Sequence, residues 1–347
     1  MADNTARGRF VWHELMTPNT AGAHEFYLKT LGWKRQPWEQ DSSYSMFAAP
    51  SGPLGGSVES RDGPPSWVPY VAVADVDATV EQAARLGGGI QTASTPIGSG
   101  SRYAVVADPQ GGTFGIYSSS ADAGPETPPR QGEFSWHELA TTDNRAAFDF
   151  YRALFAWDKI SEFDMGPMGI YLIFGRNGTQ LGGMFNKGDM GKAGAAYWVS
   201  YVRVQDVHET VEKVAAARGS LVNGPMEVPG GDWIAQFMDP YGALFAAHVL
   251  AVDVKPVKKA ARNKKRAAAK ASKRPLRKVA KKAAKKTSRK KAAKTKRSAA
   301  KKRPVARKRA AKKRSVAKKK RAAGKKRSAV KSKTRAKAAK RKKARRR

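Results

Sequence analysis

The sequence predicts an α+β fold: two homologous domains in tandem, each built from two βαβββ units, followed by a disordered basic tail. Three observations predict it. Spaced motifs occur twice, strand and helix periodicities alternate in the same order in both copies, and the composition changes abruptly after residue 254. We place the first domain at 8–119, a linker at 120–131, the second domain at 132–250 and the tail at 255–347.

The repeat is visible as short motifs at a nearly constant offset. The segment Phe10–Leu15, FVWHEL, returns as FSWHEL at Phe134–Leu139, an offset of 124. The segment Asp108–Gly111, DPQG, returns as DPYG at Asp239–Gly242, an offset of 131. A drift this small over more than 90 residues indicates two copies of one domain. The Pro-rich stretch 122–130 lies between them.

Within the first copy the periodicities give the order of elements. Alternation of apolar residues predicts strands, and apolar residues three or four apart predict helices. Asn19 and Asp75 have the side chains that cap helix N-termini, and Gly87–Gly89 can end the second helix. The expected strands are 10–16, 44–48, 55–59, 68–74, one near Ile90, 102–107 and 113–118, and the expected helices are 21–31 and 75–86.

The basic charge is concentrated in the tail. Residues 255–347 hold 49 Lys or Arg, no Asp or Glu and no aromatic residue, whereas the remaining 254 residues have a formal net charge of −10. Such a segment cannot bury enough apolar surface to offset the entropy of folding, so it is predicted to be disordered.

A polyanion is the expected partner of this tail, and DNA bound without sequence preference is the interpretation we favour. RNA remains an open alternative. A membrane is not expected, because the tail has no apolar face to insert. The basic clusters nominated for nucleic-acid binding are Lys281, Lys282, Lys285, Lys286, Lys301, Lys302, Arg303, Lys312, Lys313, Arg314, Lys318, Lys319, Lys320 and Arg321.

Both copies resemble a known family. The Trp-His-Glu-Leu strand, the Phe26-Tyr27 pair before Gly32-Trp33 and the closing Asp-Pro-x-Gly turn resemble the vicinal oxygen chelate superfamily of glyoxalases, bleomycin resistance proteins and extradiol dioxygenases. The resemblance covers about 240 residues and implies that each domain forms a curved open barrel. The tail resembles the Lys/Ala-rich arms of linker histones.

The resemblance also implies where a metal would bind, and the residues there are unsuitable. The corresponding positions are Trp12, Val68 and Gly115 in the first domain and Trp136, Val199 and Ala246 in the second. None of these side chains offers the oxygen or nitrogen donors that a divalent metal needs. No cofactor is therefore predicted, and a divalent metal enters only under the alternative that the protein is an active enzyme.

Other side chains are candidates for a ligand site on the concave sheet face. Trp12 and Glu14 alternate onto one face, as do Trp136 and Glu138, and Tyr117 and His248 are expected nearby: the candidates are Trp12, Glu14, Tyr117, Trp136, Glu138 and His248. They would anchor a small ligand or serve as a general base; alternatively, Glu14 pairs with an arginine at the barrel rim. No catalytic residue is assigned.

The remaining histidines have structural interpretations. His13 and His137 fall on the helix-facing side, where a hydrogen-bonded core histidine is expected. His24 and His208 lie in predicted helices and are expected to be exposed.

Taken together, the sequence favours a nucleoid-associated protein with a body that binds an unknown small molecule. The alternatives are a metal-dependent glyoxalase or dioxygenase that carries a DNA-binding tail, and a spacer that brings two tails together; a homodimer is left open. The chain has no cysteine, no apolar leader at its start and no long apolar stretch, so we expect a cytoplasmic, nucleoid-associated protein.

Overall fold

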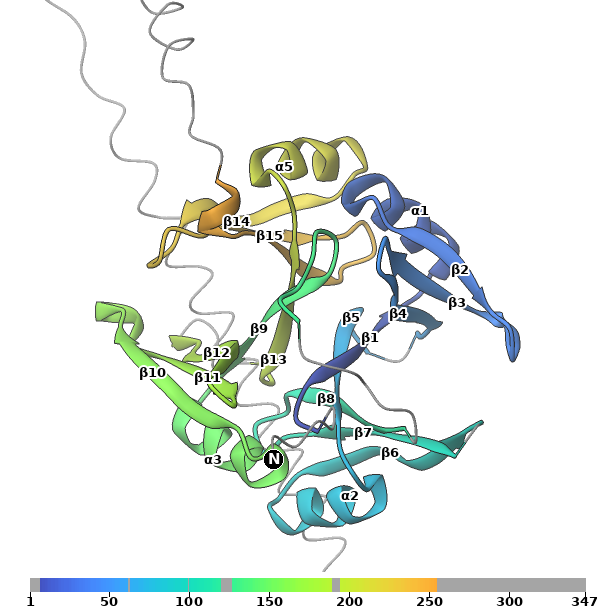
Figure 1. The fold of residues 1–347 in the computed structure, drawn as a ribbon, viewed down its shortest axis with the longest axis vertical. Coiled ribbons are helices and arrows are strands. Elements are labelled where there is room, and N and C mark those ends of the chain that lie inside the picture. Colours follow the sequence, from blue (N-terminus) through green and yellow to red (C-terminus); the bar gives the residue numbers. More distant parts are fainter. Residues whose placement is uncertain (1–6, 62, 99, 120–126, 189–193, 255–347) are drawn as a thin grey trace, which may run out of the picture. The chain divides into compact units, whose positions relative to one another are not determined.

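The computed structural model describes residues 7–61, 63–98, 100–119, 127–188 and 194–254. The tail, with its predicted disorder and all its nominated basic residues, lies outside the described residues. Within the described part the chain forms two eight-stranded mixed sheets, each accompanied by two α-helices (Figure 1). No described helix is both long and apolar enough to cross a membrane.

The first sheet has the strand order β2-β3-β4-β1-β5-β8-β7-β6. Its two halves are related: β1 runs parallel to β4, β5 runs parallel to β8, and β1 and β5 join the halves as an antiparallel pair. The elements are β1 (Phe10–Thr17), α1 (Thr20–Leu31), β2 (Lys34–Trp38), β3 (Asp41–Ala49), β4 (Gly52–Glu59), β5 (Ser66–Ala72), α2 (Val76–Arg85), β6 (Gly89–Ile97), β7 (Ser101–Ala107) and β8 (Thr113–Ser118).

The second sheet repeats this order as β10-β11-β12-β9-β13-β16-β15-β14, which confirms the predicted α+β fold with tandem pairs of βαβββ units. Its elements are β9 (Phe134–Thr141), α3 (Asn144–Phe155), β10 (Asp158–Asp164), η1 (Gly166–Met168), β11 (Ile170–Arg176), β12 (Thr179–Asn186), β13 (Tyr197–Arg203), α5 (Val207–Ala216), β14 (Ser220–Glu227), β15 (Trp233–Met238), β16 (Leu244–Val249) and η2 (Ala251–Asp253).

Local sequence signals account for most element ends. The side chain of Asn19 accepts a hydrogen bond from the backbone N–H of Gly22 at 2.9 Å, and Asp75 caps α2 in the same way through Ala78. Strand β2 was not predicted, because it is an exposed edge strand that contains Pro37 and shows no apolar alternation.

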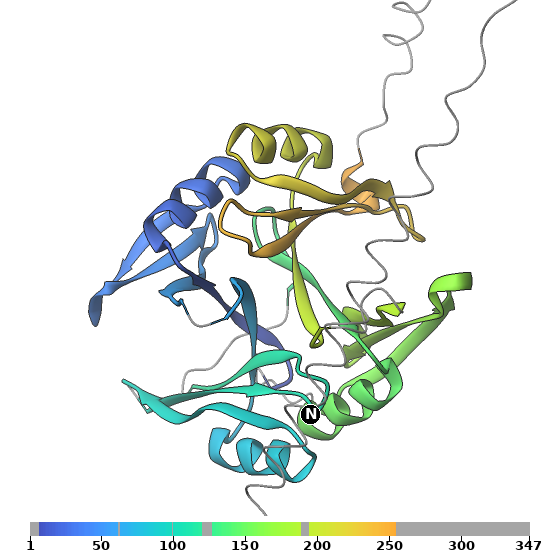
Figure 2. The ribbon, with the colours of Figure 1, turned by 180° about the vertical axis from the view of Figure 1, so that it is seen from behind.

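The two domains share their cores. One core cluster joins the second half of the first domain to the first half of the second, and the other joins the two remaining halves. Accordingly, α1 packs beside α5 and α2 packs beside α3 (Figures 1 and 2). The helix-bearing sides of both sheets thus face this interface, and alternate strand residues point away from it.

Two symmetric hydrogen bonds cross the interface. Tyr27 donates to Asp239 Oδ2 at 3.1 Å, and Tyr151 donates to Asp108 Oδ2 at 2.9 Å. Each aspartate also accepts backbone N–H bonds within its Asp-Pro-x-Gly turn, as predicted for a turn former. The repeated turn therefore has a second role, since it anchors the partner domain.

Histidines meet at the centre of the interface. Nε2 of His13 lies 2.7 Å from Nε2 of His137, and the rings stack on Phe134 and Phe10 respectively. The prediction of hydrogen-bonded core histidines is confirmed, although their partnership with each other was not foreseen. One Nε2 must donate and the other accept, so the two neutral rings have different tautomers.

Burial of this pair makes its protonation unfavourable. Burial, followed by the charge of His137, holds the pKa of His13 well below its usual value, and burial lowers the pKa of His137 to about 3. Below about pH 6.5 the histidines of the unfolded chain bind protons, whereas the folded pair stays neutral. The free energy of unfolding therefore does not depend on this pair above that pH. Below it, the free energy of unfolding falls by about 1.4 kcal/mol per pH unit for each histidine.

We expect NMR titration to show both imidazoles, His13 and His137, neutral at pH 5. NMR is the sharper readout because burial raises the pKa of Glu14 and Glu138, which acts on stability in the opposite sense. Titration of either buried ring near pH 6.5 would contradict the assignment.

The expectation for His24 was wrong. Its side chain is only 3% exposed, stacks on Phe47 at 4.0 Å and makes a hydrogen bond to Ser57, and burial lowers its pKa to about 4. The reason is that α1 packs against both its own sheet and α5, so its buried stripe is wider than that of a surface helix. His208 is exposed, as predicted.

Candidate functional site

A tyrosine–glutamate cluster lies on the face of the first sheet that points away from the domain interface. Glu14, on β1, accepts hydrogen bonds from Tyr44 on β3 at 2.8 Å and from Tyr70 on β5 at 2.9 Å. The indole N–H of Trp12 donates to the hydroxyl of Tyr44 at 3.2 Å. These four residues, Trp12, Glu14, Tyr44 and Tyr70, are the first cluster.

The second sheet carries the same arrangement, with one addition. Glu138 accepts hydrogen bonds from Tyr171 and Tyr201, both at 2.9 Å, and Trp136 donates to Tyr171 at 3.1 Å. Gln236, on β15, adds a third donor to Glu138 at 3.2 Å and also donates to Tyr201 at 2.7 Å. We call Trp136, Glu138, Tyr171, Tyr201 and Gln236 the second cluster.

Glycines make room for the tyrosine rings. A Cβ at Gly56 would lie 2.0 Å from the hydroxyl oxygen of Tyr44, and one at Gly183 would lie 2.2 Å from the ring of Tyr171. Each is the second glycine of a Leu-Gly-Gly motif that occurs in both domains. The second glycine accommodates a ring, and the first lies against the backbone of β1 or β9.

The electrostatics of both clusters are dominated by burial. Burial raises the pKa of Glu14 and of Glu138, and the tyrosine hydrogen bonds offset part of that rise by stabilising the carboxylate. Burial and the adjacent carboxylate also raise the pKa of Tyr44 and Tyr70, so these hydroxyls keep their protons and act as donors. The described hydrogen bonds of Glu14 come from these tyrosines, not from the arginine of the alternative interpretation.

The positions implied for a metal do not fit one. Trp12, Val68 and Gly115 provide no donor, and the ring of Tyr70 fills the space beside Gly115, where a Cβ would lie 2.1 Å from it. In the second domain Trp136, Val199 and Ala246 likewise provide none. Among the described residues no three His, Asp or Glu side chains converge as a metal site would require.

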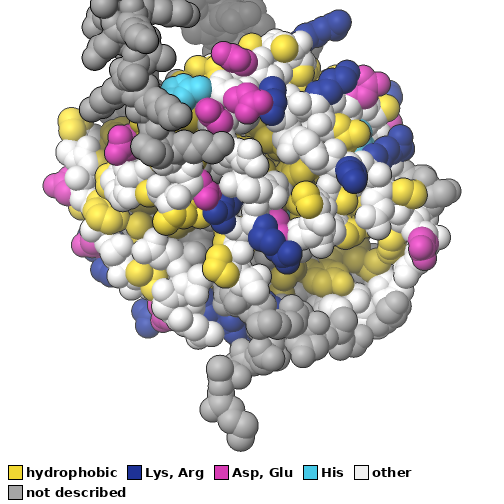
Figure 3. Space-filling view, turned by 45° about the horizontal axis from the view of Figure 1, so that its top comes forward, with side chains coloured by type: hydrophobic (Ala, Val, Ile, Leu, Met, Phe, Trp, Pro, Cys, Tyr) yellow, Lys and Arg dark blue, Asp and Glu magenta, His cyan; other side chains and the backbone are white. Residues whose placement is uncertain are grey.

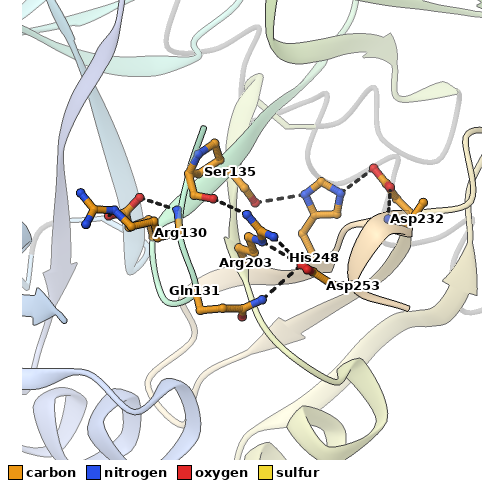
Figure 4. A network of polar contacts seen from close by, with 10 residues as sticks. Arg130, Gln131, Ser135, Arg203, Asp232, His248 and Asp253 are labelled. Carbon is orange, nitrogen blue, oxygen red and sulfur yellow. Dashed lines mark hydrogen bonds and ion pairs between the residues drawn. The ribbon is translucent and has the colours of Figure 1, made fainter. Parts of the chain in front are cut away.

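Two of the candidate residues, Tyr117 and His248, lie apart from Glu14 and Glu138. Tyr117 donates to Ser101 at 3.4 Å and makes no hydrogen bond to Glu14 among the described contacts. His248 contacts Ser135 through Nδ1 at 3.0 Å and Asp232 through Nε2 at 2.9 Å (Figure 4).

This histidine belongs to a polar network at the end of the second domain. Asp232 also accepts from the backbone N–H of Ala251, and Arg203 pairs with Asp253 at 2.7 Å. Gln131, the last residue of the predicted linker, donates to Asp253 at 3.2 Å. These contacts fix the last described turn, η2, onto the second sheet, so a structural role accounts for His248 without invoking a ligand.

Sequence reasoning missed the four tyrosines and Gln236, although a signal for the tyrosines was present. Tyr44 recurs as Tyr171 and Tyr70 as Tyr201, at offsets of 127 and 131 that match the drift of the other repeats. Gln236 has no counterpart of its own type, and strand periodicity alone did not distinguish it.

One face of the described part does not gather basic residues as a nucleic-acid interface would. On the face seen in Figure 3, Lys and Arg are interspersed with Asp and Glu. The residues nominated for nucleic-acid binding lie in the tail, outside the described part.

Comparison with known proteins supports the superfamily resemblance. Residues 133–247 match the Glyoxalase/Bleomycin resistance protein/Dioxygenase superfamily. The chain is 28% identical over 247 residues to CFP32 of Mycobacterium tuberculosis, which is named a glyoxylase; the match covers 68% of this chain and 92% of that protein. It is also 28% identical to the anthracycline biosynthesis protein DauV of Streptomyces sp., over 70% of this chain and 93% of that protein.

Solved structures show the same fold. The Mn(II)-bound glyoxalase of Novosphingobium aromaticivorans superimposes with a TM-score of 0.51 at 12% identity, over 70% of this chain and 82% of its own. The 2,3-dioxygenase LapB of Pseudomonas sp. KL28 gives the same score and identity, over 71% and 93%. These likenesses show that the described part has the tandem vicinal oxygen chelate fold, and the fold alone leaves the chemistry open.

Proposed function

We propose that this protein is held on DNA by its basic tail and that its body binds a small molecule without a metal at the superfamily positions. The charge distribution supports the proposed DNA binding: the last 93 residues hold 49 basic residues and no acidic one, next to a body of formal charge −10. Nucleoid association follows from such an anchor.

Counterion release supplies the physical basis of the anchor. Each phosphate neutralised by Lys or Arg releases condensed cations, so affinity depends steeply on salt and hardly on sequence. The tail has no aromatic residue to stack on bases. We therefore assign it non-specific binding, with DNA as the partner and RNA as the competing outcome of a binding test.

The tyrosine–glutamate clusters support the proposed binding of a small molecule by the body. Each places a carboxylate among tryptophan and tyrosine side chains on an outward sheet face, the combination of apolar walls and few polar anchors that small-molecule sites use. The relatives named for anthracycline biosynthesis make an aromatic compound a reasonable ligand to test first.

An active metal-dependent enzyme is the alternative, favoured by the glyoxylase name of the Mycobacterium relatives. The side chains at the implied metal positions oppose it. Stoichiometric metal in protein purified without chelator, together with lyase or dioxygenase turnover lost on chelation, would favour the enzyme.

Lysine acetylation of the full-length protein tests the anchor. Acetylation removes the charge of each modified lysine, whereas reductive methylation modifies the same amines and keeps it. We expect acetylation to weaken duplex DNA binding at least tenfold, measured by fluorescence anisotropy, and methylation to leave it nearly unchanged. Equal affinities of the acetylated and methylated proteins would contradict an electrostatic anchor.

A further inference from the structure

The two clusters differ in how much of the carboxylate remains available. A carboxylate has about four acceptor sites. Glu138 uses three of them and is only 9% exposed. Glu14 uses two, one on each oxygen, and is half-buried. The first cluster therefore keeps acceptor capacity within reach of solvent, and the second is nearly saturated by the protein.

One residue accounts for most of this difference. In the second sheet Gln236 pairs with Ala246, and Ala246 pairs in turn with Tyr201. In the first sheet Val105 pairs with Gly115, and Gly115 pairs in turn with Tyr70. Val105 thus occupies the position that corresponds to Gln236. A valine cannot donate, so the first carboxylate lacks the amide that covers the second.

Aromatic side chains surround the available carboxylate. Trp12, Trp38, Tyr44 and Tyr103 are all half-buried. Trp38 packs edge-on to Tyr44 at 5.7 Å, and Tyr103 lies 6.4 Å from Tyr70. Half-buried aromatic rings gathered around one polar group mark a binding surface better than scattered ones do.

The charge of this face favours a cation. The strand positions that share the face with Glu14 on β1, β3, β5, β7 and β8 include no Lys or Arg; they carry Met16, Met46, Val68, Val105 and Tyr117. On edge strand β2, Lys34 lies on this face opposite Ala48. Aromatic faces are electron-rich and attract cations, and a carboxylate that is costly to bury gains most from a positively charged donor. An anionic ligand would meet repulsion from the same groups.

We propose that the first cluster binds the ammonium group of an arylalkylamine, with Glu14 as its acceptor and Trp12, Trp38, Tyr44 and Tyr103 around its apolar part. The second cluster, whose carboxylate already accepts three hydrogen bonds, is not expected to share this preference for an ammonium group. This inference rests on the small-molecule half of the proposed function and does not depend on the DNA anchor.

Three probes of nearly equal shape test it on the full-length protein: phenethylamine, 2-phenylethanol and phenylacetate, titrated by calorimetry in moderate salt. We expect the amine to bind at least tenfold more tightly than the alcohol. Glu14→Gln should abolish that preference, and the matched change Glu138→Gln in the second cluster should retain it. Thermal unfolding checks that both variants fold.

Val105→Gln gives an independent test, because it copies the covering amide of the second cluster while leaving Glu14 in place. It should weaken amine binding at least tenfold. Alcohol or carboxylate binding as tight as the amine would overturn the ammonium inference and leave a small-molecule site standing. No binding by any of the three, or equal losses from Glu14→Gln and Glu138→Gln, would overturn this site as well.

Discussion

Replacing Gly183 with alanine is expected to lower the free energy of unfolding by about 3 kcal/mol. The added Cβ would lie 2.2 Å from the ring of Tyr171, far inside van der Waals contact. Tyr171 would have to move and release its hydrogen bond to Glu138, which is buried. Overpacking costs about 1–3 kcal/mol, and an unsatisfied buried acceptor costs a similar amount.

A glycine in open space provides the control. Gly89, on β6, has an ordinary backbone conformation, and its added Cβ would meet only the Cβ of Ala107 at 4.0 Å, so Gly89→Ala should be neutral or slightly stabilising. Denaturant unfolding of both variants measures the difference. Equal stabilities would show that the ring of Tyr171 is not held against β12 and would remove the packing account of the repeated glycine.

The repeat made most of the fold predictable. Because each motif occurs twice, strand assignments in one copy could be checked against the other, and the helix caps at Asn19 and Asp75 are found where the sequence places them. Edge strand β2 was not predicted, because an exposed edge strand shows no alternation of apolar and polar residues. Helical periodicity likewise did not show that the ring of His24 packs against its own sheet, on Phe47 and Ser57, so this buried residue was mistaken for an exposed one.

The candidate site was predictable only in part. Strand parity placed Trp12 with Glu14 and Trp136 with Glu138, and the structure brings each pair into one cluster. The tyrosines that complete the clusters come from strands 30 to 63 residues away, and pairing over such distances is set by sheet order, which periodicity does not reveal. The complete set of residues in each cluster is therefore visible only in the three-dimensional structure.

Deletion of residues 255–347 is expected to have the largest effect of all. Both sheets and both core clusters lie before residue 255, so the shortened protein should fold. Its formal charge of −10 repels DNA, whereas the full chain carries +39. With about six to ten phosphate contacts, affinity would fall by about 10³–10⁵ between 50 and 200 mM salt, and deletion should cost at least about 10³ at the lower salt concentration.

A titration of full-length protein and of residues 1–254 against two unrelated duplexes at several salt concentrations tests the proposed DNA anchor directly. We expect that only the full-length protein binds, that it does not distinguish the duplexes, and that the logarithm of its affinity falls steeply and linearly with the logarithm of salt concentration. Binding by residues 1–254, a preference for one duplex, or a shallow salt dependence of the full-length protein would contradict the proposed anchor.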